Sequence, residues 1–293
     1  MNFLSKKLLY IIPNKSNEKQ NSTLIIFDIE EEKSFKQNFN LRIISNLKGI
    51  SQLNVNNTLY CCGLNEENKS KEVVLGSYMF QINCDVTNPN PIFLVNSNFS
   101  HFSPSMSIWH SDFIIVVGGK NQIECEGYLI SKSKWIELPP LPEERYKSTL
   151  FSHEKNNVLY LFGGYSNVNN NNSKNILRLN MELCDKWDII LIKDNDLLLG
   201  RNSSVSFMFE SDHNIFICGG KDDKEEETDF ICQYNIYDRS IVKSKVNMKS
   251  ICSFNMQGYA DLNKNHFAFI DNHFVIHCVN RNDFKWNVIP FDS

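Results

Sequence analysis

The sequence predicts an all-β chain built from six copies of a four-stranded antiparallel unit, and three observations lead to this class. A short apolar run that ends in two glycines occurs three times, closing at Gly119, Gly164 and Gly220. Weaker copies of the run end at Gly63 and Asp271, so that the period is about 50 residues along the whole chain. No stretch keeps the 3.6-residue periodicity of an amphipathic helix over three turns.

The elements of each copy follow one another in a fixed order. The first copy opens with the run LLYIIP, which ends at Pro13 where other copies have glycine. In later copies a β-rich run such as STLFSH (148–153) precedes the glycine-ended run, and a short polar turn separates the two. A polar loop and two further strands come after the glycines, and an aromatic or apolar pair seven or eight positions apart marks these strands. The pairs are Tyr128 and Trp135, Leu179 and Trp187, Tyr234 and Ile241, and Val279 and Trp286.

The repeat predicts how the units pack. A four-stranded unit of about 50 residues buries both of its faces only against neighbours, and six units arranged radially achieve this. We therefore expect a single six-bladed β-propeller, with degenerate first and last blades. The expected blades are approximately 1–41, 42–97, 98–142, 143–195, 196–247 and 248–293. An irregular β-sandwich is the alternative, but sandwiches do not repeat at this period.

Side chains at the repeat positions have physical roles in such a fold. Glycines at a strand end permit positive φ and close approach of neighbouring backbones. A tryptophan in the outer strand fills the wedge between adjacent blades. The repeat residues are Gly63, Gly118, Gly119, Tyr128, Trp135, Gly163, Gly164, Trp187, Gly219, Gly220, Tyr234 and Trp286.

Gly118–Gly119 followed by Tyr128 and Trp135 resembles the kelch repeat, and the resemblance covers nearly the whole chain. It is strongest in the copies with paired glycines and weakest in the first and last. The start of the chain resembles the beginning of the propeller in proteins where a BTB and BACK region precedes kelch repeats. Because no innermost strand fits before LLYIIP, we expect either that the first blade lacks this strand or that the natural protein is longer.

Two arginines occur at one place in successive copies. Arg145 and Arg201 each lie 18 residues before the first glycine of their copy, and each begins an Arg-x-x-Ser that ends at Ser148 or Ser204. The spacing places all four residues at the start of the innermost strand, near the mouth of the central channel.

The kelch resemblance implies that arginines and serines at this position line a site for acidic peptide motifs. Guanidinium groups suit carboxylates because they donate two parallel hydrogen bonds. The alternative is structural, with each arginine capping a loop carbonyl or pairing with a neighbour such as Glu143 or Glu144.

Two polar loops fall on the same expected face. The segment 221–229, KDDKEEETD, offers carboxylates to a basic partner or is simply a solvated loop. We expect the asparagine-rich insert 167–175 to be flexible and without function.

The sequence gives little indication of catalysis or of metal binding. His273 and His277, four residues apart, would lie about 13 Å from each other on a strand. Nine cysteines without a CxxC pair are typical of reduced thiols inside the cell, and Cys218 reads as a small buried hydrophobe. Copper oxidases and sialidases with kelch-like propellers would need a tyrosine–cysteine–histidine site or three converging arginines, and neither is recognisable.

The composition also bears on disordered, membrane-spanning and nucleic-acid-binding proteins, and it disfavours all three classes. With 42% hydrophobic residues the chain has enough apolar area for a sizeable core, and it contains no apolar run of membrane-spanning length. A net charge of −4 and the lack of a basic stripe disfavour nucleic-acid binding.

We therefore expect a cytoplasmic, non-catalytic protein-interaction module without cofactor or metal. The function that we expect first for this module is recognition of a partner peptide, as in the substrate adaptors of ubiquitin ligases. A cytoskeletal scaffold that associates with actin is the alternative, and a propeller enzyme is a further one. The sequence leaves the oligomeric state open.

Overall fold

The structure is a computed structural model. It describes residues 7–12, 21–28, 33–40, 47–55, 57–65, 76–83, 90–192, 200–209, 213–245, 247–254, 256–257, 260–263, 266–273, 275–280 and 284–289. These residues form an all-β propeller, which confirms the expected fold class. No helix in these ranges is long and apolar enough to cross a membrane.

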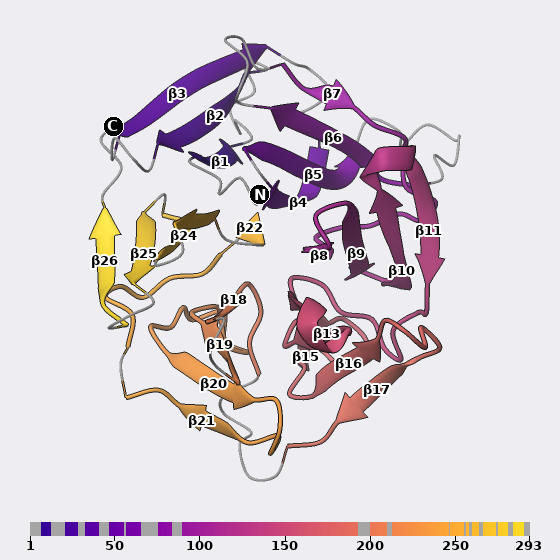
Figure 1. Ribbon diagram of the computed structural model, residues 1–293, viewed down its shortest axis with the longest axis vertical. Coiled ribbons are helices and arrows are strands. Elements are labelled where there is room, and N and C mark those ends of the chain that lie inside the picture. Colours follow the sequence, from indigo (N-terminus) through magenta and orange to yellow (C-terminus); the bar gives the residue numbers. More distant parts are fainter. Residues whose placement is uncertain are drawn as a thin grey trace.

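Five blades of three or four antiparallel strands and one composite sheet surround a central axis (Figure 1). The first blade consists of β1 (Lys7–Ile12), β2 (Asn21–Asp28) and β3 (Lys33–Asn40). The composite sheet has the spatial order β22 (Met256–Gln257), β4 (Leu47–Val55), β5 (Thr58–Asn65), β6 (Tyr78–Asn83) and β7 (Ile92–Phe93).

The other four blades have four strands each. The blade that follows the composite sheet in the chain comprises β8 (Ser105–Trp109), β9 (Phe113–Gly119), β10 (Gln122–Leu129) and β11 (Lys134–Leu138). The next comprises β12 (Thr149–His153), β13 (Val158–Phe162), β16 (Ile176–Asn180) and β17 (Trp187–Ile190). The last two comprise β18 (Val205–Met208), β19 (Asn214–Cys218), β20 (Ile231–Asn235) and β21 (Ile241–Lys243), then β23 (Ala260–Asn263), β24 (His266–Ile270), β25 (Ile276–Asn280) and β26 (Trp286–Ile289). Two short 3₁₀ turns, η2 (Ile130–Lys132) and η3 (Glu154–Asn156), connect strands.

The expectation of six blades with four antiparallel strands each is therefore wrong. The first blade has three strands, because β1 is the counterpart of the glycine-ended strand in other blades. The second copy gains a strand instead, since β22 pairs in parallel with β4 through Met256 opposite Gln52 and Gln257 opposite Leu53. The ring closes around β1, which contacts β4 and β5 as well as β23 and β24.

The marked pairs of the third and fourth strands are direct cross-strand partners. Tyr128 lies opposite Trp135, and their ring centroids are 5.2 Å apart. The same register joins Leu179 to Trp187, Tyr234 to Ile241, and Val279 to Trp286. The indole N–H of Trp135 donates at 2.8 Å to the carbonyl oxygen of Val95, in the segment that follows β7 of the preceding sheet. An outer-strand tryptophan thus joins one blade to its neighbour.

The glycine pairs lie where one blade meets the next. Gly119 has a φ of +138° and Gly164 a φ of +90°, which L-residues with a side chain rarely adopt. A Cβ on Gly164 would lie 2.1 Å from the Oγ of Ser148 in the same blade. Gly63 differs, because it lies within β5 opposite Tyr78 and has no positive φ.

The asparagine-rich insert contains regular structure. β14 (Tyr165–Ser166) pairs with β15 (Asn171–Asn172) as a small hairpin. Asn172 is buried, and its backbone N–H donates to Oδ1 of Asp223 at 2.7 Å. The expectation of a flexible insert is therefore wrong, because this hairpin packs on the acidic loop of the following blade.

Candidate functional site

One loop position recurs ahead of the innermost strand in successive blades. The N–H of Gly119 donates to the carbonyl oxygen of Arg145 at 2.9 Å, and the N–H of Gly164 donates to that of Arg201 at 2.8 Å. The N–H of Gly220 donates to the carbonyl oxygen of Cys252 at 2.9 Å. Arg145, Arg201 and Cys252 therefore occupy equivalent positions, each held by the glycine pair of the blade before it.

Backbone hydrogen bonds link these loops around the central axis. The N–H of Ser103 donates to Gly49 and that of Lys147 to Ser103, at 2.7 and 3.0 Å. The N–H of Ser203 donates to Lys147 and that of Phe254 to Ser203, at 2.8 and 2.7 Å. We call these five residues, Gly49, Ser103, Lys147, Ser203 and Phe254, the loop belt. The first four have φ between +51° and +59°, so the repeat imposes one left-handed turn on each of these loops.

Hydroxyl groups add a second set of links between blades. Ser51 donates to the carbonyl oxygen of Pro104 at 2.6 Å, and Thr149 donates to that of Ser204 at 2.7 Å. Ser105 donates to the carbonyl oxygen of Ser148 at 2.8 Å. Ser105 and Thr149 begin inner strands and Ser51 lies within one, so these bonds fix the inner strands to the loops of the next blade.

Arg145 is a buried residue that holds loops in place. Its side chain is fully inaccessible and pairs with Glu143, with Nη2 2.7 Å and Nε 3.1 Å from Oε1. Nη1 donates to the carbonyl oxygen of Asn175 at 2.8 Å. Burial lowers the pKa of Arg145, and the Glu143 carboxylate opposes this shift. These contacts are those of the structural alternative, in which the arginine pairs with an adjacent glutamate and caps a loop carbonyl.

Arg201 occupies the equivalent position with different partners. It is 5% exposed, and its guanidinium carbon lies 4.9 Å from the centroid of the Phe230 ring. Nη1 has no hydrogen-bond partner among the described residues. Ser204 donates to the carbonyl oxygen of Gly219 at 3.1 Å, and both Ser148 and Ser204 are buried. The structure thus brings the four candidate partner-binding residues to one set of loops but covers their side chains, and their role in binding stays a prediction.

His101 occupies the same position in the blade that begins at β8. Its Nδ1 lies 2.6 Å from the carbonyl oxygen of Gly118, and its Nε2 lies 3.0 Å from Oε1 of Glu126. Glu126 also accepts the backbone N–H groups of Asn98 and Phe99 and the side-chain amide of Asn98. Both ring nitrogens of His101 thus face oxygen atoms, and the Glu126 carboxylate collects donors from Asn98 and Phe99, with the side chains of His101 and Glu126 fully buried.

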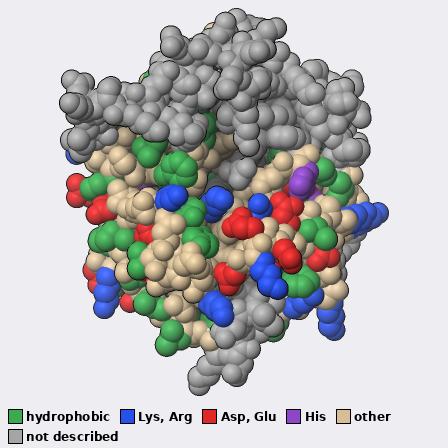
Figure 2. Space-filling model, turned by 180° about the vertical axis from the view of Figure 1, so that it is seen from behind, with side chains coloured by type: hydrophobic (Ala, Val, Ile, Leu, Met, Phe, Trp, Pro, Cys, Tyr) green, Lys and Arg blue, Asp and Glu red, His purple; other side chains and the backbone are tan. Residues whose placement is uncertain are grey.

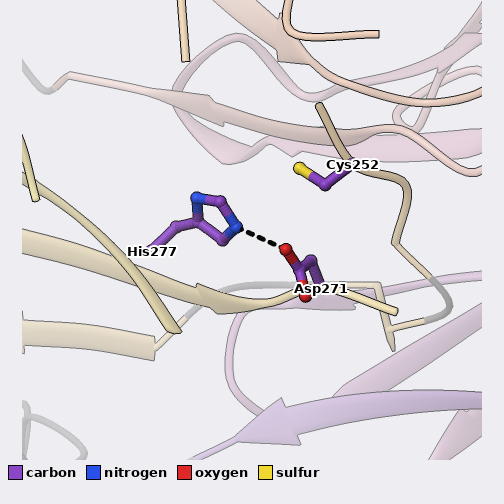
Figure 3. A group of neighbouring side chains, drawn as sticks. All are labelled: Cys252, Asp271 and His277. Atoms are coloured by element: carbon purple, nitrogen blue, oxygen red, sulfur yellow. Dashed lines mark hydrogen bonds and ion pairs between the residues drawn. The ribbon is translucent and has the colours of Figure 1, made fainter. Parts of the chain in front are cut away.

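The last blade has a buried polar cluster at this position, made of Cys252, Asp271 and His277 (Figure 3). Asp271 stands where other blades have glycine, and it closes the turn between β24 and β25. Its Oδ1 accepts the N–H groups of His273 and Val275 at 2.8 and 2.9 Å. Oδ2 lies 2.8 Å from Nε2 of His277, as the dashed line in Figure 3 shows. Burial alone would raise the pKa of Asp271, but these hydrogen bonds outweigh it and lower the pKa.

The three side chains of this cluster have the atom types and spacing of a metal site, with ligand atoms within 4.8 Å of one another. However, Nδ1 of His277 accepts the indole N–H of Trp286 at 3.0 Å. The neutral ring therefore carries its proton on Nε2, the atom that faces Asp271. A metal on Nε2 would require a proton on Nδ1, which would meet the Trp286 donor. The residues do not fit a metal.

Nucleophilic chemistry finds little support in the described residues. Burial and the nearby Asp271 carboxylate raise the pKa of Cys252, so its thiol stays protonated. Burial likewise raises the pKa of Cys62 and of Cys125 to about 12, and it raises that of Cys218.

Sequence reasoning missed both the His101–Glu126 pair and the Cys252 cluster. One signal was present for the cluster, because Cys252 precedes Asp271 by nearly the spacing that separates Arg201 from Gly219. His273 and His277 do not converge. His273 instead pairs with Glu227 of the preceding blade, with Nε2 2.7 Å from Oε2.

No known protein family and no curated protein matches the sequence. The class of the protein therefore rests on strand order and repeat geometry, which define an all-β propeller. Propellers commonly serve as protein-interaction modules.

Proposed function

We propose that this chain is a non-catalytic protein-interaction module of the kelch type, and that its partner binds the loop face. We define the loop face as the segments 101–104, 145–148, 201–204 and 252–254 together with the loops 120–121, 163–175 and 219–230. The observation that carries the proposal is the loop belt, whose hydrogen bonds hold loops of successive blades in one arrangement. Loops fixed in advance lose little conformational entropy when a partner binds.

The chemistry of the buried groups supports a binding role over catalysis. The thiols with the most strongly raised pKa values are inaccessible, and the imidazoles of His101 and His277 have partners at both nitrogens. A catalytic acid, base or nucleophile must be able to reach its substrate. These buried thiols and imidazoles instead pack within the fold and hold the loops in place.

A protein partner suits the surface better than nucleic acid does. Among the described residues of the face in Figure 2, acidic and basic side chains are interspersed with apolar ones, with no broad field of one sign. A long polyanion needs an extended basic stripe. With the kelch resemblance, this surface supports a cytoplasmic adaptor that recognises a partner peptide, as substrate adaptors of ubiquitin ligases do.

The experiment compares two matched surface variants in affinity purification with mass spectrometry from the native cells. Val168 is 83% exposed in the loop of the β14–β15 hairpin, and Leu183 is 70% exposed in the β16–β17 turn at the opposite end of the same blade. We expect Val168→Asp to lose a protein that both the wild type and Leu183→Asp capture. If both variants keep the same partners as the wild type, or if the wild type enriches none, the proposed function is wrong.

A further inference from the structure

The loop belt is an open chain of hydrogen bonds with two ends. One end is the carbonyl oxygen of Gly49, which accepts the N–H of Ser103 at 2.7 Å. The other end is Phe254, whose N–H donates to Ser203 at 2.7 Å. Gly49 belongs to the composite sheet, and Phe254 lies in the segment that leads to the last blade. The first blade contacts both of these sheets, and no described residue of it takes part in the belt (Figure 1).

The short strand β22 connects the two ends of the belt. Its first residue, Met256, follows Phe254 by two positions, and two residues of extended chain reach at most about 7 Å. The strand pairs in parallel with Gln52 and Leu53 of β4, three and four positions after Gly49. It lies at the inner end of the composite sheet, near the central axis (Figure 1). The belt and β22 together therefore form a closed circuit around the axis that bypasses the first blade.

The pairing of β22 with β4 is the weakest part of this circuit. It joins two residues in parallel, whereas β5 pairs with the other edge of β4 in antiparallel at seven positions. Parallel pairing is slightly less stable per residue, and segments held by few hydrogen bonds open at a low free energy. Gly49 lies at a break in the β4–β5 register, between Lys48 and Ser51, which leaves its carbonyl oxygen for Ser103. The circuit can therefore open at β22 while the sheets of the blades stay intact.

We propose that β22 is a clasp that closes the loop belt, and that its release from β4 opens the loop face on the side of the first blade. With the clasp shut, the two ends of the belt are joined and the loops keep one arrangement. With the clasp released, the hydrogen bonds at Ser103 and Phe254 lose the support of a closed circuit, and the loops that contain these residues gain freedom to move. A partner that prefers the ordered loops would hold the clasp shut, and by reciprocity the shut clasp would favour that partner. The inference goes beyond the proposed function, because it concerns the protein without a partner.

Hydrogen exchange with mass spectrometry on the full chain tests the clasp. Met256→Pro/Gln257→Pro removes both backbone N–H groups of β22, so the strand can no longer donate to β4. We expect the amides of Ser103 and Phe254, at the two ends of the belt, to exchange at least tenfold faster in this variant than in the wild type. The amides of β13, in a blade remote from the clasp, should exchange at the rate of the wild type.

Ile92→Pro/Phe93→Pro is the matched control. It places the same two substitutions in β7, which is also a strand of two residues but lies at the outer edge of the same sheet and pairs with β6. The control should speed exchange around β6 and leave the amides of Ser103 and Phe254 as slow as in the wild type.

A second measurement keeps the inference testable if the proline variant does not fold. In the wild type at low urea concentrations, the amides of β22 and of both belt ends should share one opening free energy, lower than that of β13. Different opening free energies for β22 and the belt ends would overturn the inference. So would slow exchange at the belt ends in Met256→Pro/Gln257→Pro, or an acceleration of equal size in β13 or in the control variant. Because exchange is measured without a partner, a loss of the Val168 dependence of partner capture would refute the proposed function and leave the clasp standing.

Discussion

The indole N–H of Trp286 donates to Nδ1 of His277 over 3.0 Å, and this one bond determines the state of the buried cluster in the last blade. It fixes the imidazole proton on Nε2, which donates to Asp271 at 2.8 Å. Asp271 in turn closes the turn that the glycine pair closes in other blades. The hydrogen-bonded side chains of Trp286, His277 and Asp271 thus stand where the repeat has two glycines in other blades.

A first prediction follows for metals. Because the Trp286 donor occupies Nδ1 of His277, excess zinc should leave the unfolding temperature unchanged relative to protein in EDTA. Thermal unfolding monitored by circular dichroism measures this, and elemental analysis of the purified protein provides the control. One tightly bound zinc per chain, together with a raised unfolding temperature, would contradict the tautomer assignment.

Gly164→Ala should lower the free energy of unfolding by about 2–4 kcal/mol. The new Cβ would lie 2.1 Å from the Ser148 Oγ, and alanine disfavours a φ of +90°. Urea denaturation measures the loss, with Lys132→Ala at an exposed 3₁₀ turn as the control. A change in Gly164→Ala no larger than in the control would show that this junction between strand and loop tolerates a side chain.

Arg145→Ala should lower the free energy of unfolding by about 3 kcal/mol, because it removes the guanidinium that pairs with Glu143 and donates to the carbonyl oxygen of Asn175. Glu143→Gln should lower the free energy of unfolding by less than Arg145→Ala does, since the Glu143 side chain is 33% exposed. Chemical denaturation of both variants provides the comparison. Undiminished stability in Arg145→Ala, combined with lost partner capture, would instead restore the binding role predicted for this arginine.

Glu126→Gln should lower the free energy of unfolding by about 3 kcal/mol, because the new amide group would place N–H donors among the buried donors that the carboxylate now accepts. The matched control is Glu137→Gln. Glu137 lies opposite Glu126 in the β10–β11 register but is exposed. Equal denaturation midpoints for the two variants would show that the buried hydrogen bonds of Glu126 contribute no more to stability than those of an exposed glutamate.

The repeat made much of this arrangement predictable. The spacing of Tyr128 and Trp135 predicted a hairpin, because a fixed separation along the chain brings two residues opposite each other in adjacent strands. The shared position of Arg145 and Arg201 was equally visible, but their burial was not, since it depends on loops such as the one containing Asn175. The parallel pairing of β22 with β4 joins residues about 200 positions apart, and no local pattern indicates it.

The last prediction concerns pH. The hydrogen bond to Glu227 raises the pKa of His273, with burial opposing it. Burial would raise the pKa of Glu227, but hydrogen bonds from Ser253 and His273 lower it. The histidine therefore contributes stability that is fully present below its ordinary pKa of 6.5 and is lost as the pH rises through its higher folded value. Glu227 contributes stability that is fully present above its ordinary pKa of 4.5, and this stability is lost as the pH falls through the lower pKa that Glu227 has in the folded protein.

The ion pair should therefore stabilise the fold most between about pH 4.5 and 6.5. Its contribution should be at most about 1 kcal/mol, because the His273 side chain is 58% exposed. A double-mutant cycle with His273→Gln and Glu227→Gln, measured by urea denaturation, should give a coupling energy that is present at pH 5.5 and absent at pH 9. A coupling energy that stays constant over this range, or one that grows as the pH rises, would show that these two loops are not joined by a charged pair.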